Sequence, residues 1–278
     1  MSSQRLNIAQ VNPSSRAKKS QANSQRLEIQ ATMERMWHQN PEQFNPERDC
    51  IQRQRIQKTV QLIKESISLD KKRAVDLGCG SGVLSRVLRD AGADVDAVDI
   101  AGNALKALQE HNMQHIRPVQ DCFPMTSLED DAYDVVVCTE TIGYLPASVY
   151  RLAFAELSRL LKNDGRIICS TELDLNSEDA LERLNALAET EFTIDLWVFS
   201  HHRLFLRLCQ FLKWIGCPTS RLRQSSFAMN FFEKICRFLY PEKGISHALF
   251  MGKRRPMTFP LPAKEIPREM PHKRELWT

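Results

Sequence analysis

The 278-residue chain lacks the segments that mark membrane and secreted proteins. No apolar run approaches the ~20 residues that a membrane-spanning helix needs, and the N-terminus has no apolar core of the signal-peptide kind. The eight cysteines never form a Cys-x-x-Cys pair, which argues against a zinc ribbon or a thioredoxin-type site. Several stand inside apolar runs, so we expect buried, reduced thiols and a cytoplasmic location.

Acidic residues are missing from positions 1–27, which hold five bases. Residues 253–278 hold seven bases and three acids, so of the 38 bases and 34 acids in the chain, 26 and 31 fall in 28–252. The net charge of +4 therefore comes from two tails, +5 and +4, around a body of −5. This argues against a basic nucleic-acid-binding body. We expect a disordered basic leader at 1–24 and a Pro-rich basic tail at 253–278.

Short apolar strands alternate with helices through the middle of the chain. The expected strands are 73–77, 94–99, 116–119, 134–139 and 166–171, and the expected helices between them are 83–90, 103–112 and 148–161. This alternation predicts an α/β fold with a doubly wound, mostly parallel sheet. Residues 25–70 precede it as an N-terminal helical lid, and 71–252 form the main domain, with helical insertions after residue 172.

The pattern is less regular after residue 172. We expect helices at 177–188, 203–215 and 231–239 and closing strands at 219–226 and 246–252, whereas 190–202 fit no pattern. An apolar stripe in the second of these helices, which ends at Phe211, Leu212 and Trp214, could be core or a contact surface, and we expect core.

Three glycines follow the first expected strand as Gly78-x-Gly80-x-Gly82. In a parallel sheet, ligands bind at the carboxyl ends of the strands, and glycine lets the backbone turn tightly beside a ligand. The next helix would direct its free N–H groups at an anionic part of that ligand. A dinucleotide-binding domain spaces its glycines as G-x-G-x-x-G, and the spacing here is different.

Acidic residues accompany this turn at the expected strand ends. Asp76 precedes the glycines, Asp99 ends the second strand, Asp121 follows the third and Asp134 opens the fourth. As a set, these features resemble the class I S-adenosylmethionine-dependent methyltransferases. The matching stretches are 75–82, 97–100, 119–122, 133–140 and 160–168. The resemblance implies a seven-stranded Rossmann-like methyltransferase sheet of the methyltransferase type 11 or quinone-ring O-methyltransferase kind.

The resemblance also implies a cofactor, S-adenosyl-L-methionine, and a role for each matching residue. The turn of Gly78, Cys79 and Gly80 would pack against the methionine part, braced by Asp76. Asp99 would hold the ribose hydroxyls, although it could instead cap the next helix. The remaining implied contacts are Ile100 on the adenine face, Asp121 and the Cys122 backbone at the adenine edge, and Thr139 on the methionine side. Asp121 could also only brace the turn at Phe123-Pro124.

The entry segment resembles the O-methyltransferases of ubiquinone biosynthesis. Trp37, Phe44-x-Pro46 and an arginine precede the first strand, and in those enzymes the arginine can reach the cofactor carboxylate. Arg53 and Arg55 are both candidates here, and Arg55 is our choice. The alternative is a surface arginine on an amphipathic lid helix.

Methyl transfer needs alignment and exclusion of water, and a hydroxyl acceptor must also lose its proton to a base. The candidates are Glu140, Tyr144, His38 and His201-His202. Many family members that act on small molecules have Glu-His where this chain has Gly143-Tyr144, which puts a base at that loop in doubt. Tyr144 could line the acceptor pocket or simply pack, and His201 could be catalytic or belong to a helix start.

The sequence therefore predicts an enzyme that transfers a methyl group from S-adenosylmethionine to a small molecule, with an aromatic or quinone hydroxyl as the finer expectation and no metal site. One alternative is methylation of RNA or protein, with the basic tails as anchors. Another is a non-catalytic, cofactor-binding partner protein. The tails are candidates for weak contact with an anionic membrane surface or with RNA.

Overall fold

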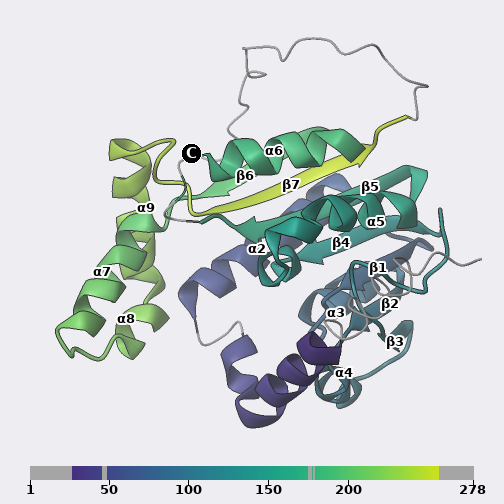
Figure 1. Cartoon of the computed structure of the whole chain (residues 1–278), viewed down its shortest axis with the longest axis horizontal. Helices are drawn as coiled ribbons and strands as arrows, with labels where there is room; N and C mark the ends of the chain where they lie inside the picture. The colour runs from purple at the N-terminus through teal and green to yellow at the C-terminus, as the bar shows by residue number, and fades with distance from the viewer. Residues whose placement is uncertain (1–26, 46–48, 175–176, 178, 257–278) are drawn as a thin grey trace, which may run out of the picture.

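The computed structural model of the chain describes residues 27–45, 49–174, 177 and 179–256. The expected leader at 1–24 and most of the expected tail at 253–278 lie outside these residues. Figure 1 shows one seven-stranded sheet in the order β3-β2-β1-β4-β5-β7-β6. Its strands are β1 (Arg73–Leu77), β2 (Asp94–Asp99), β3 (Ile116–Gln120), β4 (Tyr133–Thr139), β5 (Leu161–Glu172), β6 (Phe192–Ser200) and β7 (His247–Arg254). The expected Rossmann-like α/β fold is confirmed.

The first five strands pair in parallel, and β7 runs antiparallel between β5 and β6. The start of β7 therefore lies beside the carboxyl ends of its neighbours. His247 is in register with Glu172 of β5 and with Ser200 of β6. Residues from the last part of the chain thus reach the edge of the sheet where the glycine turn also lies.

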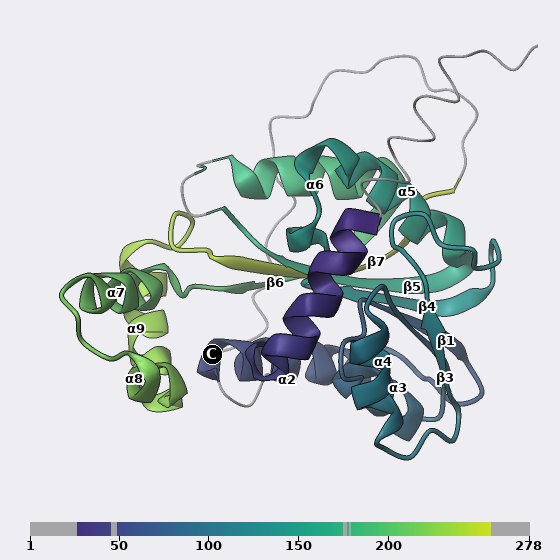
Figure 2. The ribbon, with the colours of Figure 1, turned by 60° about the horizontal axis from the view of Figure 1, so that its bottom comes forward.

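Helices cover both faces of the sheet (Figures 1 and 2). The helices are α2 (Cys50–Ser66), α3 (Val83–Asp90), α4 (Gly102–Gln109), α5 (Tyr150–Leu160), α6 (Ala180–Glu191), α7 (Arg203–Trp214), α8 (Ser220–Gln224) and α9 (Ser226–Leu239). One core joins α5 and α6 to one face of the strands, and a second joins α2, α3 and α4 to the other. Because both faces of the sheet are buried, the central strand β4 is apolar over most of its length.

The central strand β4 shows how its residues divide between the two cores. Val136 and Cys138 pack in the core under α5 and α6, while Val135 and Val137 pack in the core under α2, α3 and α4. Successive side chains of a strand point to opposite faces, so the uninterrupted run of apolar residues supplies both layers.

The helices α7, α8 and α9 form a separate hairpin inserted between β6 and β7, at one end of the sheet in Figures 1 and 2. One prediction is wrong here, and one unassigned segment is now placed. The strand expected at 219–226 is helical, because Ser225 caps α9 by accepting from the Ala228 N–H. Residues 192–200, which fitted no pattern, form β6 instead and fill that place in the sheet.

The apolar stripe of α7 is core only in part. Phe205 and Cys209 pack with Met229 of α9 and with Cys50 and Ile51 of α2. Phe211 and Trp214, which we expected to be core, are exposed instead. No helix in the described part of the chain is both long and apolar enough to cross a bilayer.

Candidate active site

The glycine turn joins β1 to α3 at the carboxyl edge of the sheet. Gly78, Gly80 and Gly82 have φ of +74°, +53° and +74°, which strain any residue with a Cβ. A Cβ on Gly78 would lie 2.1 Å from Thr141 Oγ1, and one on Gly82 would lie 2.2 Å from Leu108 Cδ1. Two of the three glycines are therefore required by packing inside the protein, whatever they do for a ligand.

Asp76 lies directly before this turn and is 2% exposed. Its Oδ2 accepts from the Ser85 hydroxyl of α3 at 2.6 Å, which ties the end of β1 to the helix after the turn. Burial raises the pKa of Asp76 to about 6, and the nearby carboxylate of Asp99 adds to that rise. Asp76 thus forms the bracing contact expected of it, in a setting that penalises its negative charge.

Asp99 brings the end of β2 to the glycine turn. Its Oδ2 accepts from the Gly80 N–H at 3.0 Å, and its Oδ1 accepts from the Ala101 N–H at 2.9 Å. Burial raises the pKa of Asp99 despite these backbone donors. The carboxylate therefore joins the glycine turn to Ala101, the residue directly before α4.

A different carboxylate caps α4. Glu34, from the helix at residues 27–39, accepts from the Gly102 N–H at 2.6 Å and from the Asn103 N–H at 3.1 Å. Negative charge at a helix start is favourable. The same N-terminal helix, which crosses in front of the sheet in Figure 2, carries Trp37. A Cβ on Gly80 would lie 3.3 Å from the Trp37 ring, which itself stacks on Phe44 of the 3-10 helix η1 (Pro41–Phe44) at 4.6 Å.

Asp121 lies in the loop after β3 and closes that loop. Its side chain accepts from the Cys122 N–H at 2.7 Å and from the N–H and hydroxyl of Ser127 at 2.6 and 2.7 Å. The turn-bracing interpretation of Asp121 thus has direct support. Cys79 and Cys122 are buried, and Ile100 and Thr139 are partly buried at the ends of β2 and β4.

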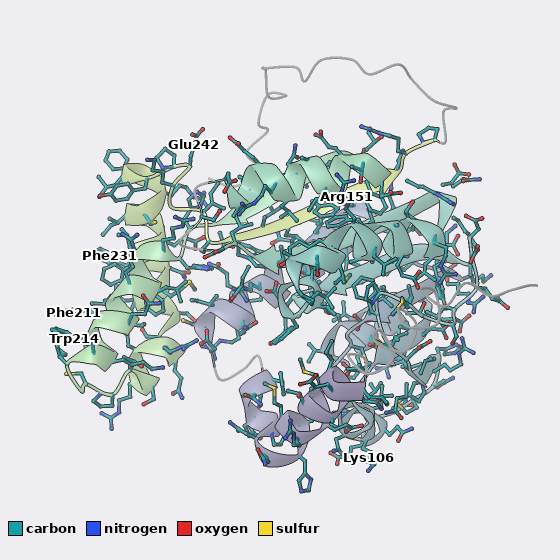
Figure 3. The ribbon with its side chains drawn as sticks, in the orientation of Figure 1. Lys106, Arg151, Phe211, Trp214, Phe231 and Glu242 are labelled. Atoms are coloured by element: carbon teal, nitrogen blue, oxygen red, sulfur yellow. The ribbon has the colours of Figure 1, made fainter. Side chains whose placement is uncertain are left out.

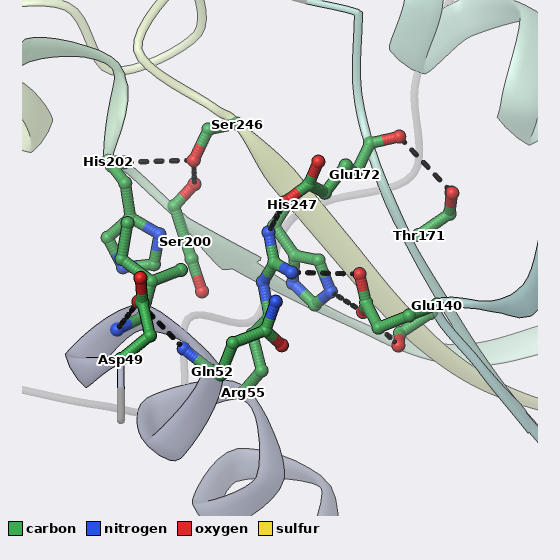
Figure 4. Close-up of polar contacts among 12 residues, drawn as sticks. Asp49, Gln52, Arg55, Glu140, Thr171, Glu172, Ser200, His202, Ser246 and His247 are labelled. Carbon is green, nitrogen blue, oxygen red and sulfur yellow. Dashed lines mark hydrogen bonds and ion pairs between the residues drawn. The ribbon is translucent and has the colours of Figure 1, made fainter. Parts of the chain in front are cut away.

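A second group of polar residues gathers at the ends of β4, β5 and β7 (Figure 4). Glu140 follows β4 at a φ of +64° and lies in the N-cap position of the 3-10 helix η3 (Thr141–Tyr144). Its carboxylate accepts from Arg55 Nη1 at 3.0 Å, from the Ser170 hydroxyl at 2.7 Å, and from His247 Nε2. We call Arg55, Glu140, Glu172 and His247 the carboxyl-edge cluster.

Arg55 comes to this cluster from α2 and is 5% exposed. Its Nη2 donates to Glu172, the last residue of β5, so the guanidinium joins the carboxylates that follow two neighbouring strands. Arg55 Nε is buried without a hydrogen-bond partner among the described residues. In this structure Arg55 therefore binds carboxylates of the protein itself.

Burial opposes the charge of Glu140, but His247, Arg55 and Ser170 outweigh it and lower the Glu140 pKa to about 2. Burial also lowers the pKa of His247, despite the attraction of Glu140. A neutral imidazole that donates from Nε2 carries its free lone pair on Nδ1. Nδ1 of His247 is buried and has no hydrogen-bond partner in the described part of the chain.

His201 lies outside the carboxyl-edge cluster. Its Nε2 is 2.9 Å from the Pro241 carbonyl oxygen, and burial lowers its pKa. His202 Nε2 is 2.8 Å from Gln54 Oε1, and burial lowers the His202 pKa to about 3. Among the described residues, no hydrogen bond or ion pair joins His201 to Glu140. The structure therefore favours the packing interpretation of the histidine pair.

Tyr144 ends η3 and is 57% exposed. Partial burial and then the carboxylates of Glu172 and Glu140 raise its pKa, which places its hydroxyl in the field of the cluster. His38 is exposed on the N-terminal helix. Of the sequence-predicted bases, only Glu140 and Tyr144 thus lie at the cluster, together with Arg55.

His247 was missed by sequence reasoning, because it lies 107 positions from Glu140. The one available signal was its place at the start of the last expected strand. In a sheet of this topology, that start meets the carboxyl ends of neighbouring strands.

Comparison with known proteins supports the methyltransferase resemblance that the sequence motifs indicate. A family model described as a methyltransferase domain matches residues 47–212, more than half of the chain. A ubiquinone biosynthesis O-methyltransferase from Bordetella avium is 34% identical over 110 residues, covering 37% of this chain and 44% of that protein. One from Hydrogenovibrio crunogenus is 31% identical over 120 residues, covering 40% and 47%. The chain spans about half the length of the curated relatives it matches.

Solved structures share the fold at low identity. The N-methyltransferase NodS from Bradyrhizobium japonicum, in complex with S-adenosyl-l-homocysteine, matches with a TM-score of 0.50 at 15% identity, covering 74% of this chain and 87% of that one. A Listeria monocytogenes protein assigned to the S-adenosylmethionine-dependent methyltransferases gives 0.51 at 15% identity, covering 70% and 96%. Together with the glycine turn and the family match, this shows that the chain belongs to the S-adenosylmethionine-dependent methyltransferases.

Proposed function

We propose that the protein transfers a methyl group from S-adenosylmethionine to a hydroxyl of a small aromatic or quinone-type molecule. The observation that carries the oxygen acceptor is the His247 imidazole, whose Nε2 is hydrogen-bonded to Glu140 and whose Nδ1 has no hydrogen-bond partner among the described residues. The relatives named ubiquinone biosynthesis O-methyltransferase support the same acceptor class over the part of the chain they match.

The residues at the carboxyl ends of β1 and β2 fit an adenosyl sulfonium. A Cβ on Gly80 would lie only 3.3 Å from the Trp37 ring, and the Asp99 carboxylate accepts from the Gly80 N–H. Asp99 would hold the ribose hydroxyls, and Ile100 would cover the adenine. Asp76, Asp99 and Glu34 add negative charge near the place where a cationic sulfonium would lie. When bound, S-adenosylmethionine supplies an activated methyl group.

In this proposal His247 removes the proton of the acceptor hydroxyl once binding of the acceptor opens a path to the buried Nδ1. The proton ends on Nδ1, and the adjacent Glu140 carboxylate stabilises the imidazolium that forms, the division of labour known from other histidine–carboxylate pairs. Glu140 is a positioning residue, because it acts through His247. Arg55 holds Glu140 and Glu172 in place, and a partly exposed Tyr144 borders the acceptor side.

The first experiment measures cofactor binding by calorimetry. Asp99→Asn keeps the size of the side chain but removes its charge, and we expect at least a tenfold weaker affinity for S-adenosylmethionine, since hydrogen bonds to charged groups are the stronger ones. Asp94→Asn is the matched control, because Asp94 opens the same strand at the opposite edge of the sheet. Equal affinities of Asp99→Asn and wild type would contradict the cofactor assignment.

The second experiment identifies the acceptor. The protein is incubated with methyl-labelled S-adenosylmethionine and matched panels of catechols, hydroquinones and amines, with a cell extract divided into small molecules and macromolecules. We expect labelled methyl ethers of the phenolic compounds. Label found only on amines, on RNA or on protein would reject the proposed acceptor and leave the cofactor assignment standing.

A further inference from the structure

The hairpin of α7, α8 and α9 presents aromatic side chains to solvent. Trp214, Phe227 and Phe238 are 82%, 84% and 86% exposed, and Phe211 and Phe231 are more than half exposed. Figure 3 shows Phe211, Trp214 and Phe231 along the outer side of the hairpin, away from the sheet. Several large aromatic side chains exposed on one hairpin indicate an interaction site rather than ordinary surface.

These aromatics fall into one stripe on each long helix. Arg207, Phe211 and Trp214 follow helical spacing on α7, and α9 repeats the pattern with Phe227, Phe231, Lys234 and Phe238. The opposite sides of the two helices pack inward through Phe205, Cys209 and Met229. We call the two outward stripes the docking face, defined by Arg207, Phe211, Trp214, Phe227, Phe231, Lys234 and Phe238.

Positive charge accompanies the aromatics. Residues 203–243 contain eight bases and two acids, a net charge of +6, whereas the rest of 28–252 carries −11. Of the two acids, Glu233 is buried and paired with Lys58 of α2. Arg207, Lys213, Arg221 and Lys234 are all exposed. The hairpin is therefore a basic projection on an acidic body.

We propose that the docking face binds an anionic lipid surface. Helices that combine aromatic residues with Lys and Arg lie at the boundary between headgroups and acyl chains, where the aromatics are buried and the bases meet anionic lipids. Aromatic rings with an apolar body suit that boundary. A second copy of the chain is a poorer occupant, because a symmetric contact would bring two +6 surfaces together.

The topology places the docking face on a hairpin that starts and ends at the edge of the sheet holding the carboxyl-edge cluster. The hairpin leaves the sheet after Ser200 at the end of β6 and returns at His247, the first residue of β7. It therefore stands on the same edge of the sheet as the carboxyl-edge cluster. At its base, Lys58 of α2 donates to Ser200 Oγ at 2.8 Å and pairs with Glu233 of α9 at 3.2 Å. A protein bound through the docking face would hold this edge near the lipid. The inference does not depend on the acceptor proposed above.

The test is co-sedimentation of the full-length protein with vesicles of phosphatidylcholine alone or mixed with phosphatidylglycerol. We expect binding to the mixed vesicles only, and about tenfold weaker binding for Phe211→Ser/Trp214→Ser. Because both side chains are more than half exposed, the fold should be unaffected, which circular dichroism checks. Leu152→Ser is the control, because Leu152 is also exposed but lies on α5.

Two further measurements separate the docking face from the basic tails and from self-association. Arg207→Glu/Lys234→Glu should weaken vesicle binding, whereas Lys106→Glu/Arg151→Glu changes the net charge equally but lies on α4 and α5 (Figure 3) and should not. The Trp214 fluorescence should shift to the blue on binding, a shift that Trp214→Phe removes. The inference is overturned by absence of vesicle binding, by equal loss in both charge pairs, or by a dimer that only the face substitutions dissociate.

Discussion

The imidazole of His247 is hydrogen-bonded to the carboxylate of Glu140, although 107 positions separate the two residues in the chain. The contact joins the start of the antiparallel strand β7 to the loop after the parallel strand β4, so it exists only once the sheet is complete. It fixes the ring so that the buried Nδ1 has no hydrogen-bond partner among the residues that the structure describes. The proton transfer proposed above takes place at this pair.

Replacing the imidazole tests its role as a base. His247→Gln should lower kcat for methylation of a hydroxyl by about a hundredfold or more, the usual contribution of a general base, while S-adenosylmethionine affinity stays within twofold. In the wild type, kcat should fall as the pH is lowered through the depressed His247 pKa. His201→Gln is the control, since His201 binds a backbone carbonyl instead. Equal kcat for His247→Gln and wild type would exclude His247 as the base.

Glu140 should contribute to stability above pH 4.5. Its folded-state pKa is about 2, below the ordinary 4.5, because His247, Arg55 and Ser170 favour its charged form over the opposing effect of burial. The stabilisation is therefore present above pH 4.5 and is lost as the pH falls from about 4.5 to about 2. We expect Glu140→Gln to reduce the free energy of unfolding by about 2 kcal/mol at pH 7. Denaturant titrations should show this difference shrinking below pH 4.5.

Local patterns carried the prediction of the sheet and the glycine turn. Strand β4 is a nearly continuous apolar run, β1, β2 and β5 contain shorter apolar stretches, and the turn between β1 and α3 is read from three glycines within five positions. The residues that give these signals lie close together in the sequence. The signals can therefore be recognised without knowledge of the folded structure. The position of Asp99 at the end of β2 followed from the same regularity, whereas the contact between Asp76 and the Ser85 hydroxyl was not predicted.

The carboxyl-edge cluster was only partly predictable, because its contacts join distant segments. Arg55 pairs with residues 85 and 117 positions away, and no spacing in the sequence indicates this. The hairpin was misjudged for a different reason. Trp214 and Phe211 are large apolar residues of the kind usually found in a core. Only the packing of α7 on α9 through Phe205 and Cys209 decides that they face outward.

Cofactor affinity should depend on the ionisation of Asp76. Burial raises its pKa to about 6, and a bound sulfonium would favour its charged form and so lower that pKa. Binding should therefore release protons near pH 6, and affinity should increase as the pH rises from 5 to 7. Calorimetry in two buffers of different ionisation enthalpy measures the released protons. Asp76→Asn should abolish the proton release, and a release that persists in this variant would assign it to another group.

A Cβ at Gly78 should destabilise the protein more than the positive φ of this residue alone would. Gly78→Ala combines a φ of +74° with a contact of 2.1 Å to Thr141 Oγ1. Gly216→Ala is the matched control, because its φ of +79° is similar but nothing lies within 4 Å of its Cβ. We expect Gly216→Ala to lower the free energy of unfolding by about 1 kcal/mol from backbone strain, and Gly78→Ala by about 3 kcal/mol because Thr141 must also move. Equal losses in thermal unfolding would show that Thr141 shifts freely, and the loop after β4 would then not constrain the turn.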